Sequence, residues 1–428
     1  MSDYYDYMLP TVNFMGPGCV EVVGERCKIL GAKKVLIVTD SFLRNMEGGP
    51  VDQVVKYLKK ANLNYAFYDE VEPNPKDVNV YAGLKIYERE NCDMIVTIGG
   101  GSAHDCGKAI GVAATHDGDL YKDYAGIEKL ENETPPMVCV NTTAGTASEV
   151  TRHTVITDTS QTPNVKFVIV SWRNTPDVSI NDPELMVGKP PGLTAATGMD
   201  ALTHAVETYV STNANALTDA AAIKSIELVA NNLRKVVKDG QDIKARENMA
   251  NASVLSGFAF NNGGLGYVHA MAHQLGGFYD MPHGIANAIL LPYVEKFNLG
   301  TDVERFSNIT EIFGKEQSKI SNNPEAQESI KAIKDEIDKL KRFKKIAEVF
   351  GVDTSNMSTR EAAEASLDAI KELARDIGIP SSLSESKFDV KRDDFEEMAK
   401  LALEDGNAGT NPRKGSVEDI VRIFEDAF

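Results

Sequence analysis

Two patterns of hydrophobic and polar positions divide the chain. Between Lys33 and about Ile180, short and uniformly apolar runs alternate with helical stretches, whereas from Thr194 onward almost every segment has a helical pattern rich in Ala, Leu, Glu and Lys. Short apolar runs between helices are typical of strands buried on both faces of a parallel sheet. We therefore expect an α/β half followed by an all-helical half.

The first half predicts four strands and three helices. The strands are expected at 33–40, 64–69, 93–100 and 136–143, and the helices near 50–61, near 77–90 and from 102 onward. The two halves meet at LMVGKPPG (185–192), where Gly and two Pro interrupt both patterns. We expect an α/β domain at 1–188 and an all-α domain at 189–428, with a cleft between them that favours a small-molecule site.

One internal repeat is visible in the second half. RFSNITEIFG (305–314) and RFKKIAEVFG (342–351) share Phe, Ile and Phe at helical spacing, and the segment between them is charged and amphipathic. Two copies are too few for a solenoid. We expect a charged helical insertion at about 316–340 on the surface, with an oligomer contact as the functional alternative.

Charge and composition exclude several classes of protein. Asp and Glu outnumber Lys and Arg by 63 to 45, and this net charge of −18 would repel a phosphate backbone or an anionic membrane surface. No apolar run reaches the about 20 residues that span a bilayer, and the first twenty residues lack the features of a secretory signal. Five cysteines without a CxxC pair argue against a disulfide framework. We expect a cytoplasmic protein that binds neither nucleic acid nor membrane.

A glycine loop follows the third predicted strand. The strand leads into Gly99-Gly100-Gly101-Ser102 and then into a helix. Glycines let backbone amides approach a diphosphate, and a helix N-terminus adds bare N–H groups and a positive dipole end. The loop lacks the usual GxGxxG spacing, and it is no Walker A loop because Ala109 stands where a Mg²⁺-binding Ser or Thr is required. We predict an anion site, with a tight strand-to-helix turn as the structural alternative.

Two other polar loops follow neighbouring strands. Asp40 is the last residue of the first strand. At this position its carboxylate can bind a ribose 2′-hydroxyl and disfavour a 2′-phosphate. Alternatively, it can simply cap the next helix. The hydroxyl-rich segment 141–148 follows the fourth strand. Open α/β sheets bind their ligands at the carboxyl ends of such strands. We therefore predict that the first half is a Rossmann-like dinucleotide-binding domain that prefers NAD to NADP.

The histidines gather in the helical half, which holds four of the chain's seven within residues 204–283. Asp200 and His204 stand four residues apart, as do His269 and His273, so each pair shares a helix face. His283 follows at the start of the next apolar helix. A set of one Asp and several His suits Fe²⁺, Zn²⁺ or Mn²⁺. For any single histidine a place in the core is the alternative, and spacing alone does not choose the ligands among His269, His273 and His283.

The chemistry of such a site follows from its neighbours. The segment HAMAH (269–273) lacks the Glu of the HExxH motif, so attack of a metal-activated water on a peptide is disfavoured. With a dinucleotide loop in the other half, metal-assisted hydride transfer fits better. The metal, as a Lewis acid, would lower the pKa of a bound alcohol and hold its alkoxide while carbon delivers a hydride to the nicotinamide.

Long motifs in both halves resemble one family. Over essentially its whole length the chain is similar to the iron-dependent (group III) alcohol dehydrogenases. The segments that carry the resemblance are GGGSAHDCGKAIG (99–111), NTTAGTASEVTRH (141–153), SINDPELM (179–186), TAATGMDALTHAVE (194–207), FNNGGLGYVHAMAHQLGGFYDMPHGIANAILLP (260–292) and DGNAGTNPRKG (405–415).

The resemblance implies roles for individual residues. It implies that the metal is Fe²⁺, with Zn²⁺ or Mn²⁺ as alternatives. The implied ligands of this metal are Asp200, His204, His269 and His283. His273 is then the histidine that lines the site without binding the metal, in proton transfer or nicotinamide positioning. The residues implied to contact NAD are Asp40, Gly99, Gly100, Gly101, Ser102, Asp105, Thr142, Thr143, Thr146, Thr151 and Lys166.

The implied activity is NAD-dependent interconversion of a primary alcohol and its aldehyde. 1,3-Propanediol and 3-hydroxypropanal are the first expectation, and methanol or other short alcohols the alternative. The resemblance also implies a homo-oligomer, either a dimer or a larger ring of dimers such as a decamer. A lyase like dehydroquinate synthase would need a basic pocket, and the Lys and Arg residues of 200–290 lie away from the His motifs. A silent dinucleotide sensor would lack a metal ligand, and none is missing.

Overall fold

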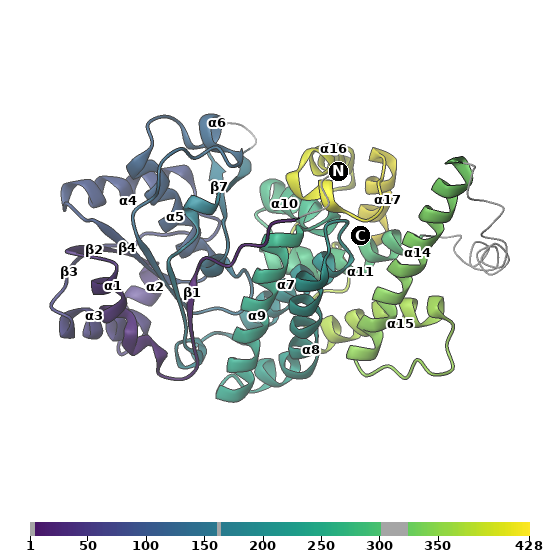
Figure 1. Ribbon diagram of the computed structural model, residues 1–428, viewed down its shortest axis with the longest axis horizontal. Coiled ribbons are helices and arrows are strands. Elements are labelled where there is room, and N and C mark those ends of the chain that lie inside the picture. The colour runs from purple at the N-terminus through teal and green to yellow at the C-terminus, as the bar shows by residue number, and fades with distance from the viewer. Residues whose placement is uncertain (1–4, 161–163, 301–323) are drawn as a thin grey trace.

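The two halves predicted from the sequence form two regions of the molecule. The computed structural model describes residues 5–160, 164–300 and 324–428, with the backbone alone for 324–334. Figure 1 shows the α/β region, coloured purple to blue, beside a helical region coloured teal to yellow. The predicted fold class is therefore confirmed.

A six-stranded sheet forms the centre of the α/β region. Its order is β1 (Val12–Met15), β9 (Val178–Asn181), β6 (Met137–Asn141), β4 (Met94–Gly99), β2 (Lys34–Val38) and β3 (Asn64–Tyr68). All neighbouring pairs are parallel. The four predicted strands are present, whereas β1 and β9 on one side of the sheet were not predicted.

Helices cover both faces of this sheet because its strands are apolar on both faces. Val35 and Ile37 of β2 belong to the core shared with α3 (Pro50–Lys60), and Leu36 and Val38 to the core shared with α5 (Gly101–Thr115). Successive side chains of a strand point to opposite faces, so a run without polar residues needs a cover on each side. The remaining helices of this region are α1 (Val23–Ile29), α2 (Ser41–Arg44), α4 (Asp77–Arg89) and α6 (Leu120–Tyr124).

A second, three-stranded sheet departs from the parallel prediction. Its order is β5 (Gly126–Ile127), β8 (Val165–Val170) and β7 (His153–Asp158), and β7 pairs with β8 in antiparallel fashion. The connection between β7 and β8 is too short for the helical crossover that two parallel strands need. These strands carry His153 and Lys166 toward the helical region, where both line the cavity described below.

The helical region has one continuous apolar core. Its helices are α7 (Pro191–Val210), α8 (Ala216–Lys238), α9 (Ile243–Gly263), α10 (Tyr267–Tyr279), α11 (His283–Leu299), α14 (Pro324–Val349), α15 (Thr359–Asp376), α16 (Phe395–Glu404) and α17 (Val417–Ala427). α7 packs against α8, α9 and α11, and its residues are buried around most of its circumference. It begins at Pro191, close to the boundary at 188–189, and we propose that boundary as the division between the domains.

The predicted charged insertion is described only in part. Residues 324–340 are helical, as the first part of α14, whereas 316–323 and the first repeat copy at 305–314 lie outside the described residues. The second copy, at 342–351, does not lie wholly on the surface as expected. Phe343 and Ile346 are fully buried because the apolar side of α14 packs into the helical core.

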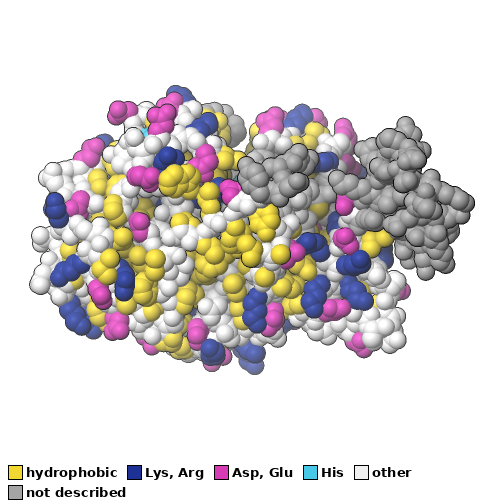
Figure 2. All heavy atoms as spheres, viewed as in Figure 1, with side chains coloured by type: hydrophobic (Ala, Val, Ile, Leu, Met, Phe, Trp, Pro, Cys, Tyr) yellow, Lys and Arg dark blue, Asp and Glu magenta, His cyan; other side chains and the backbone are white. Residues whose placement is uncertain are grey.

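One face of the molecule carries mixed charge and an apolar area. Figure 2 shows acidic and basic side chains interspersed over one face, with apolar side chains gathered near its centre. Leu9, Val12 and Met15, which lead into and form β1, are 51%, 55% and 37% exposed. All five cysteines are free thiols. Within the described ranges no helix has the length and apolar character needed to cross a membrane.

Candidate active site

The glycine loop joins β4 to α5 at the carboxyl edge of the sheet. Gly99 has a φ of 151°, a conformation that favours glycine. A Cβ on Gly100 would lie 2.8 Å from Oγ1 of Thr143, and a Cβ on Gly101 would lie 2.8 Å from Oγ1 of Thr146. Only glycines let this loop pack so closely on the loop after β6. No side chain caps α5, so its first amides are available to an anion.

Asp40 follows β2 at the same edge, because β2 and β6 both neighbour β4. Its Oδ1 accepts a hydrogen bond from the backbone N of Leu43 at 2.9 Å, so the residue caps α2, as the structural alternative supposed. Contact with a ribose stays a prediction for its carboxylate.

A buried lysine holds the loop after β6 in place. Nζ of Lys108 donates to Oγ of Ser148 at 3.0 Å and to the carbonyl oxygens of Thr151 and His153 at 2.7 and 3.0 Å. Oδ1 of Asp105 accepts from the same Ser148 hydroxyl at 2.6 Å. Burial lowers the pKa of Lys108, and Asp105 opposes that shift. This role of Lys108 was not predicted from the sequence, although a lysine within the apolar run CGKAIGVAA (106–114) indicates a buried cation that needs partners.

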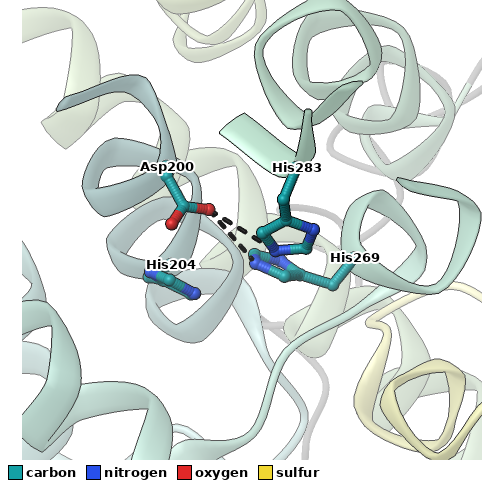
Figure 3. Close-up of side chains that lie close together, drawn as sticks. All are labelled: Asp200, His204, His269 and His283. Carbon is teal, nitrogen blue, oxygen red and sulfur yellow. Dashed lines mark ion pairs between the residues drawn. The ribbon is translucent and has the colours of Figure 1, made fainter. Parts of the chain in front are cut away.

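Four side chains from three helices converge in the helical region (Figure 3). Asp200 and His204 come from α7, His269 from the first turn of α10 and His283 from the start of α11. Each offers one ligand atom, and these atoms lie within 4.8 Å of one another. Nε2 of His269 and Nε2 of His283 are 3.8 and 3.6 Å from Oδ1 of Asp200. Three imidazole nitrogens and one carboxylate oxygen this close together fit a divalent cation with ligand bonds of about 2.0–2.2 Å.

The surroundings keep these histidines neutral, the form that binds a metal. Burial lowers the pKa of His204, and it holds the pKa of His269 and of His283 well below the usual value, with nearby histidines adding to the shift. Burial raises the pKa of Asp200. The imidazole of His204 stacks between Phe260 and His269, with ring centroids 4.4 and 4.5 Å away. Its orientation is thus fixed by apolar as well as polar neighbours.

Asn287 occupies the space between three of the four residues, one turn after His283. Its Nδ2 lies 2.8 Å from Oδ1 of Asp200 and 3.1 Å from Nε2 of both His269 and His283. The three ligand atoms therefore face a common point. Sequence reasoning missed this residue, although its spacing of four from His283 on an apolar helix was visible.

His273 lies beside the group of four and has a different partner. Its Nδ1 is 2.7 Å from Oδ2 of Asp405, and its ring stacks on that of His283 with centroids 5.5 Å apart. Asp405 begins the DGNAGTNPRKG motif and also accepts from the backbone N of Asn407 at 2.9 Å. The structure thereby distinguishes His273 from His269 and His283, because His273 is not a member of the group of four. Helical spacing alone could not make this distinction.

One cavity of about 550 Å³ connects the two regions. Of the residues predicted from the sequence, those that line it are Gly101, Ser102, Asp105, Thr146, Thr151, Lys166, Asp200, His204, His269, His273 and His283. The predicted positions Asp40, Gly99, Gly100, Thr142 and Thr143 are not among its lining residues. The start of α5 and the ligand group therefore open into the same space.

A polar bridge includes two residues that line this cavity, Asn74 and Lys166. Nζ of Lys166 donates to Oδ1 of Asn74 at 2.8 Å, and Nδ2 of Asn74 donates to Oδ1 of Asp280 at 2.7 Å. Burial lowers the pKa of Lys166 to about 8. The bridge links the α/β region to the end of α10.

Comparison with known families matches nearly the whole chain. Residues 10–183 match the family described as iron-containing alcohol dehydrogenase, and residues 194–341 and 328–428 match the C-terminal part of the Fe-containing alcohol dehydrogenase family.

Similar proteins cover the chain from end to end. A 1,3-propanediol dehydrogenase of Klebsiella pneumoniae is 55% identical over 424 residues, which are 99% of both chains. An NAD-dependent methanol dehydrogenase of Bacillus methanolicus is 42% identical over 99% of this chain and all of that one. A solved structure of a 1,3-propanediol oxidoreductase superposes with a TM-score of 0.87 at 55% identity, covering 99% of this chain and 100% of that one.

Proposed function

The chain belongs to the iron-containing alcohol dehydrogenase family, and from that premise we propose that it interconverts 1,3-propanediol and 3-hydroxypropanal with NAD as the hydride acceptor. The observation that carries this proposal is the single cavity shared by the ligand group and the helix N-terminus after the glycine loop. The substrate pair is supported by the 55% identity to the Klebsiella protein of that name. Methanol is the second candidate, because the 42% identity to a methanol dehydrogenase also extends over the whole chain.

The residues that would hold Fe²⁺ are Asp200, His204, His269 and His283. When bound there, Fe²⁺ supplies Lewis-acid polarisation of the alcohol oxygen. Zn²⁺ and Mn²⁺ suit the same donors, and metal supply decides among such ions. The carboxylate of Asp200 would supply one negative charge to a bound cation, whereas the histidines would supply none because burial keeps them neutral.

His273 is the residue that we propose for proton transfer. Because Oδ2 of Asp405 faces Nδ1, the proton of the neutral ring stays on Nδ1 and Nε2 keeps its lone pair. Nε2 can then accept the hydroxyl proton of an alcohol and return it to the aldehyde oxygen in the reverse direction. The dyad needs no movement of α10 or α16, since both side chains already line the cavity.

NAD binding rests on local groups. At a net charge of −18 the whole protein does not attract a diphosphate, so the amides at the start of α5 and the neighbouring threonine loop must do so. Lys166, which lines the same cavity, adds a cation. We assign the preference for NAD over NADP to Asp40, whose carboxylate would repel a 2′-phosphate.

The lyase and sensor alternatives have less support. A lyase acting on a phosphorylated acid needs several cations, and among the described residues that line the cavity the cations are Lys166 and Arg152. Arg152 is already engaged, with Nη1 3.4 Å from Oε1 of Glu128. A silent sensor is disfavoured because all four members of the ligand group are in place.

The test is a substrate panel on protein purified without oxygen and loaded with Fe²⁺. NADH formation would be followed by its absorbance with 1,3-propanediol, methanol, ethanol and butanol. We expect kcat/KM to be highest for 1,3-propanediol. A maximum at methanol would favour the second candidate, and no NADH from any alcohol, with no NADH consumption on the aldehydes, would overturn the proposed activity.

We further propose that the protein forms a homodimer through β1 and that it resides in the cytoplasm. β1 is an outer strand of the sheet, and the apolar side chains of its Val12 and Met15 are exposed. An unpaired strand edge beside apolar side chains is a template for association. Light scattering would measure the mass of the assembly. We expect the mass of two chains, or of ten chains if the dimers form a decamer, and the mass of one chain would contradict the proposal.

The proposed place in the cytoplasm is supported by the cysteines. All five are free thiols, which is typical of a reducing compartment.

A further inference from the structure

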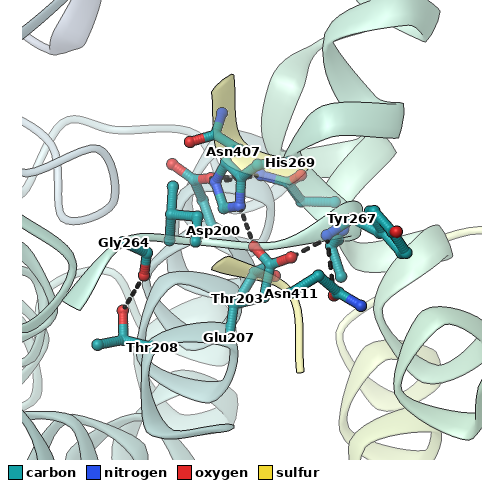
Figure 4. Close-up of polar contacts among 12 residues, drawn as sticks. Asp200, Thr203, Glu207, Thr208, Gly264, Tyr267, His269, Asn407 and Asn411 are labelled. Carbon is teal, nitrogen blue, oxygen red and sulfur yellow. Dashed lines mark hydrogen bonds and ion pairs between the residues drawn. The ribbon is translucent and has the colours of Figure 1, made fainter. Parts of the chain in front are cut away.

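Glu207 shares helix α7 with two members of the ligand group. It follows His204 by three residues and Asp200 by seven, so all three side chains project from one side of the helix. Glu207 is 2% exposed and is not among the residues that line the cavity. In Figure 4 its carboxylate points toward the beginning of α10. A buried carboxylate in such a place requires donors that compensate its loss of water.

Both oxygens of this carboxylate are engaged by the first turn of α10. Oε1 accepts a hydrogen bond from the backbone N of Val268 at 2.7 Å, and Oε2 contacts Nδ1 of His269. The side chain of Glu207 thus accepts from the backbone at the start of α10 and also holds the imidazole ring of His269. A side chain with a single acceptor oxygen, or a shorter one, could not serve both partners as an acceptor.

The other nitrogen of His269 faces the ligand group. Nε2 lies 3.8 Å from Oδ1 of Asp200 and 3.1 Å from Nδ2 of Asn287. A neutral imidazole carries one proton, so a cation bound by Nε2 requires that proton to be on Nδ1. Oε2 of Glu207 lies at Nδ1 as the acceptor of this proton, and the lone pair of Nε2 is left facing the ligand group.

The plane of the ring is fixed separately. The imidazoles of His204 and His269 stack with centroids 4.5 Å apart and an angle of 19° between their planes. Stacking defines the plane but still allows a flip of about 180° around the Cβ–Cγ bond, which exchanges Nδ1 with Cδ2 and Nε2 with Cε1. The contact of Glu207 with Nδ1 selects the flip in which Nε2 faces the ligand group.

We propose that Glu207 is a positioning residue of the metal site, which holds His269 as the Nδ1–H tautomer and ties that orientation to the start of α10. The inference rests on the proposed function, because it presupposes a divalent metal at this group. Glu207 acts through His269 and touches neither substrate nor cofactor.

Glu207→Gln is the sharpest variant, because it keeps the size of the side chain. If the Gln oxygen accepts from Val268, its NH₂ group meets Nδ1 of His269 and drives the proton to Nε2, which then cannot bind the metal. If the Gln turns over, its NH₂ group faces the N–H of Val268, and two donors oppose each other. Either arrangement weakens the site without creating a cavity.

The matched control is Glu149→Gln. Glu149 is also fully buried, and its Oε1 accepts from Nδ2 of Asn141 at 3.0 Å, but it lies in the α/β region and contacts no member of the ligand group. The affinity of metal-free protein for Co²⁺ would be measured by competition with a chelator, together with the visible spectrum of the Co²⁺ complex. Loss of such an outer partner lowers metal affinity by about 10–100-fold. We expect that loss in Glu207→Gln and wild-type affinity in Glu149→Gln.

A second measurement uses the wild-type chain, so it does not depend on the folding of a variant. Nitrogen NMR of protein labelled only in its histidines, with His269 assigned by substitution, should report a protonated Nδ1 in the Zn²⁺-loaded state. Wild-type Co²⁺ affinity and spectrum in Glu207→Gln, or an unprotonated Nδ1 in His269, would overturn the inference. A wild-type protein that binds no divalent metal would instead overturn the proposed function.

Discussion

Nδ1 of His273 and Oδ2 of Asp405 lie 2.7 Å apart although 132 residues separate them in the chain. The pair joins α10 to the loop after α16 at the wall of the cavity. Since Asp405 also accepts from the backbone N of Asn407, its carboxylate cannot turn away without losing a second hydrogen bond.

Asp405→Asn should therefore reduce turnover while leaving the metal in place. An asparagine can accept from His273 or from Asn407, but its NH₂ group then opposes the other donor, so the tautomer of His273 is no longer fixed. Positioned acid–base groups contribute roughly 10²–10⁴-fold in rate, and we expect kcat to fall by about a hundredfold. Steady-state kinetics and elemental analysis test this. Glu396→Gln, at an exposed ion pair on α16, is the control; equal kcat in all three proteins would refute a role for the dyad.

His269→Ala and His283→Ala should each lose metal and activity together. Each removes one of four ligand atoms that lie within 4.8 Å of one another. Metal content per chain, measured after purification and again after dialysis against excess Fe²⁺, would be compared with His116→Ala, whose side chain lies in the α/β region. Full occupancy in both ligand variants would show that the cation binds elsewhere.

Gly101→Ala should weaken NAD binding. The new Cβ would lie 2.8 Å from Oγ1 of Thr146, so the glycine loop must move away from the loop after β6. Loss of one hydrogen bond to a charged group costs about 1.5–3 kcal/mol, so we expect the KM for NAD to rise by at least about tenfold. Gly192→Ala is the control, because nothing lies within 4 Å of its Cβ position and alanine favours the helix there. An unchanged KM in Gly101→Ala would argue that NAD does not use this loop.

Glu149→Gln should remove a pH dependence of stability. Oε1 of Glu149 accepts from Nδ2 of Asn141 at 3.0 Å, and burial raises the pKa of this carboxyl group to about 7. The folded state thus holds a proton that the unfolded state releases above its ordinary pKa near 4.5. The free energy of unfolding contributed by this group is greatest below that value and is lost as pH rises through about 7.

Urea unfolding at about pH 5.5 and about pH 8 would measure this effect, since each pKa unit is worth about 1.4 kcal/mol. We expect the stability of Glu149→Gln, relative to wild type, to increase by about 2 kcal/mol between these two pH values. Glu133→Gln, whose side chain is 69% exposed, should show no such difference. The same slope in wild type and Glu149→Gln would assign the proton to another group.

The sequence predicted what short-range patterns determine. Uniform apolar runs placed β2, β3, β4 and β6, and the i, i+4 spacing of Asp200 and His204 placed both on one helix face. The antiparallel pair β7 and β8 was not predicted. The alternation of apolar and polar residues within a strand does not determine which other strand it pairs with. β1 and β9 were missed for the same reason, since each is short and becomes a strand only by pairing with the sheet.

The partners of the site residues could not be predicted, because they come from distant parts of the chain. Glu207 and His269 are 62 residues apart, and Asn287 and Asp200 are 87 apart. No local pattern marks such pairs, and His269 and His273 have the same helical spacing. The tertiary fold distinguishes them by giving one a carboxylate from α7 and the other a carboxylate from the loop after α16.

Helix α7 also determines how this enzyme tolerates changes in length. Asp200, His204 and Glu207 all lie on it, so the site depends on a single helical register. One residue inserted after Asp200 would rotate His204 and Glu207 by about 100° around the helix axis. The change would remove a proposed ligand and the proposed positioning carboxylate at once, although neither residue had been replaced. Deletion or insertion scanning should therefore find α7 the least permissive segment of the chain.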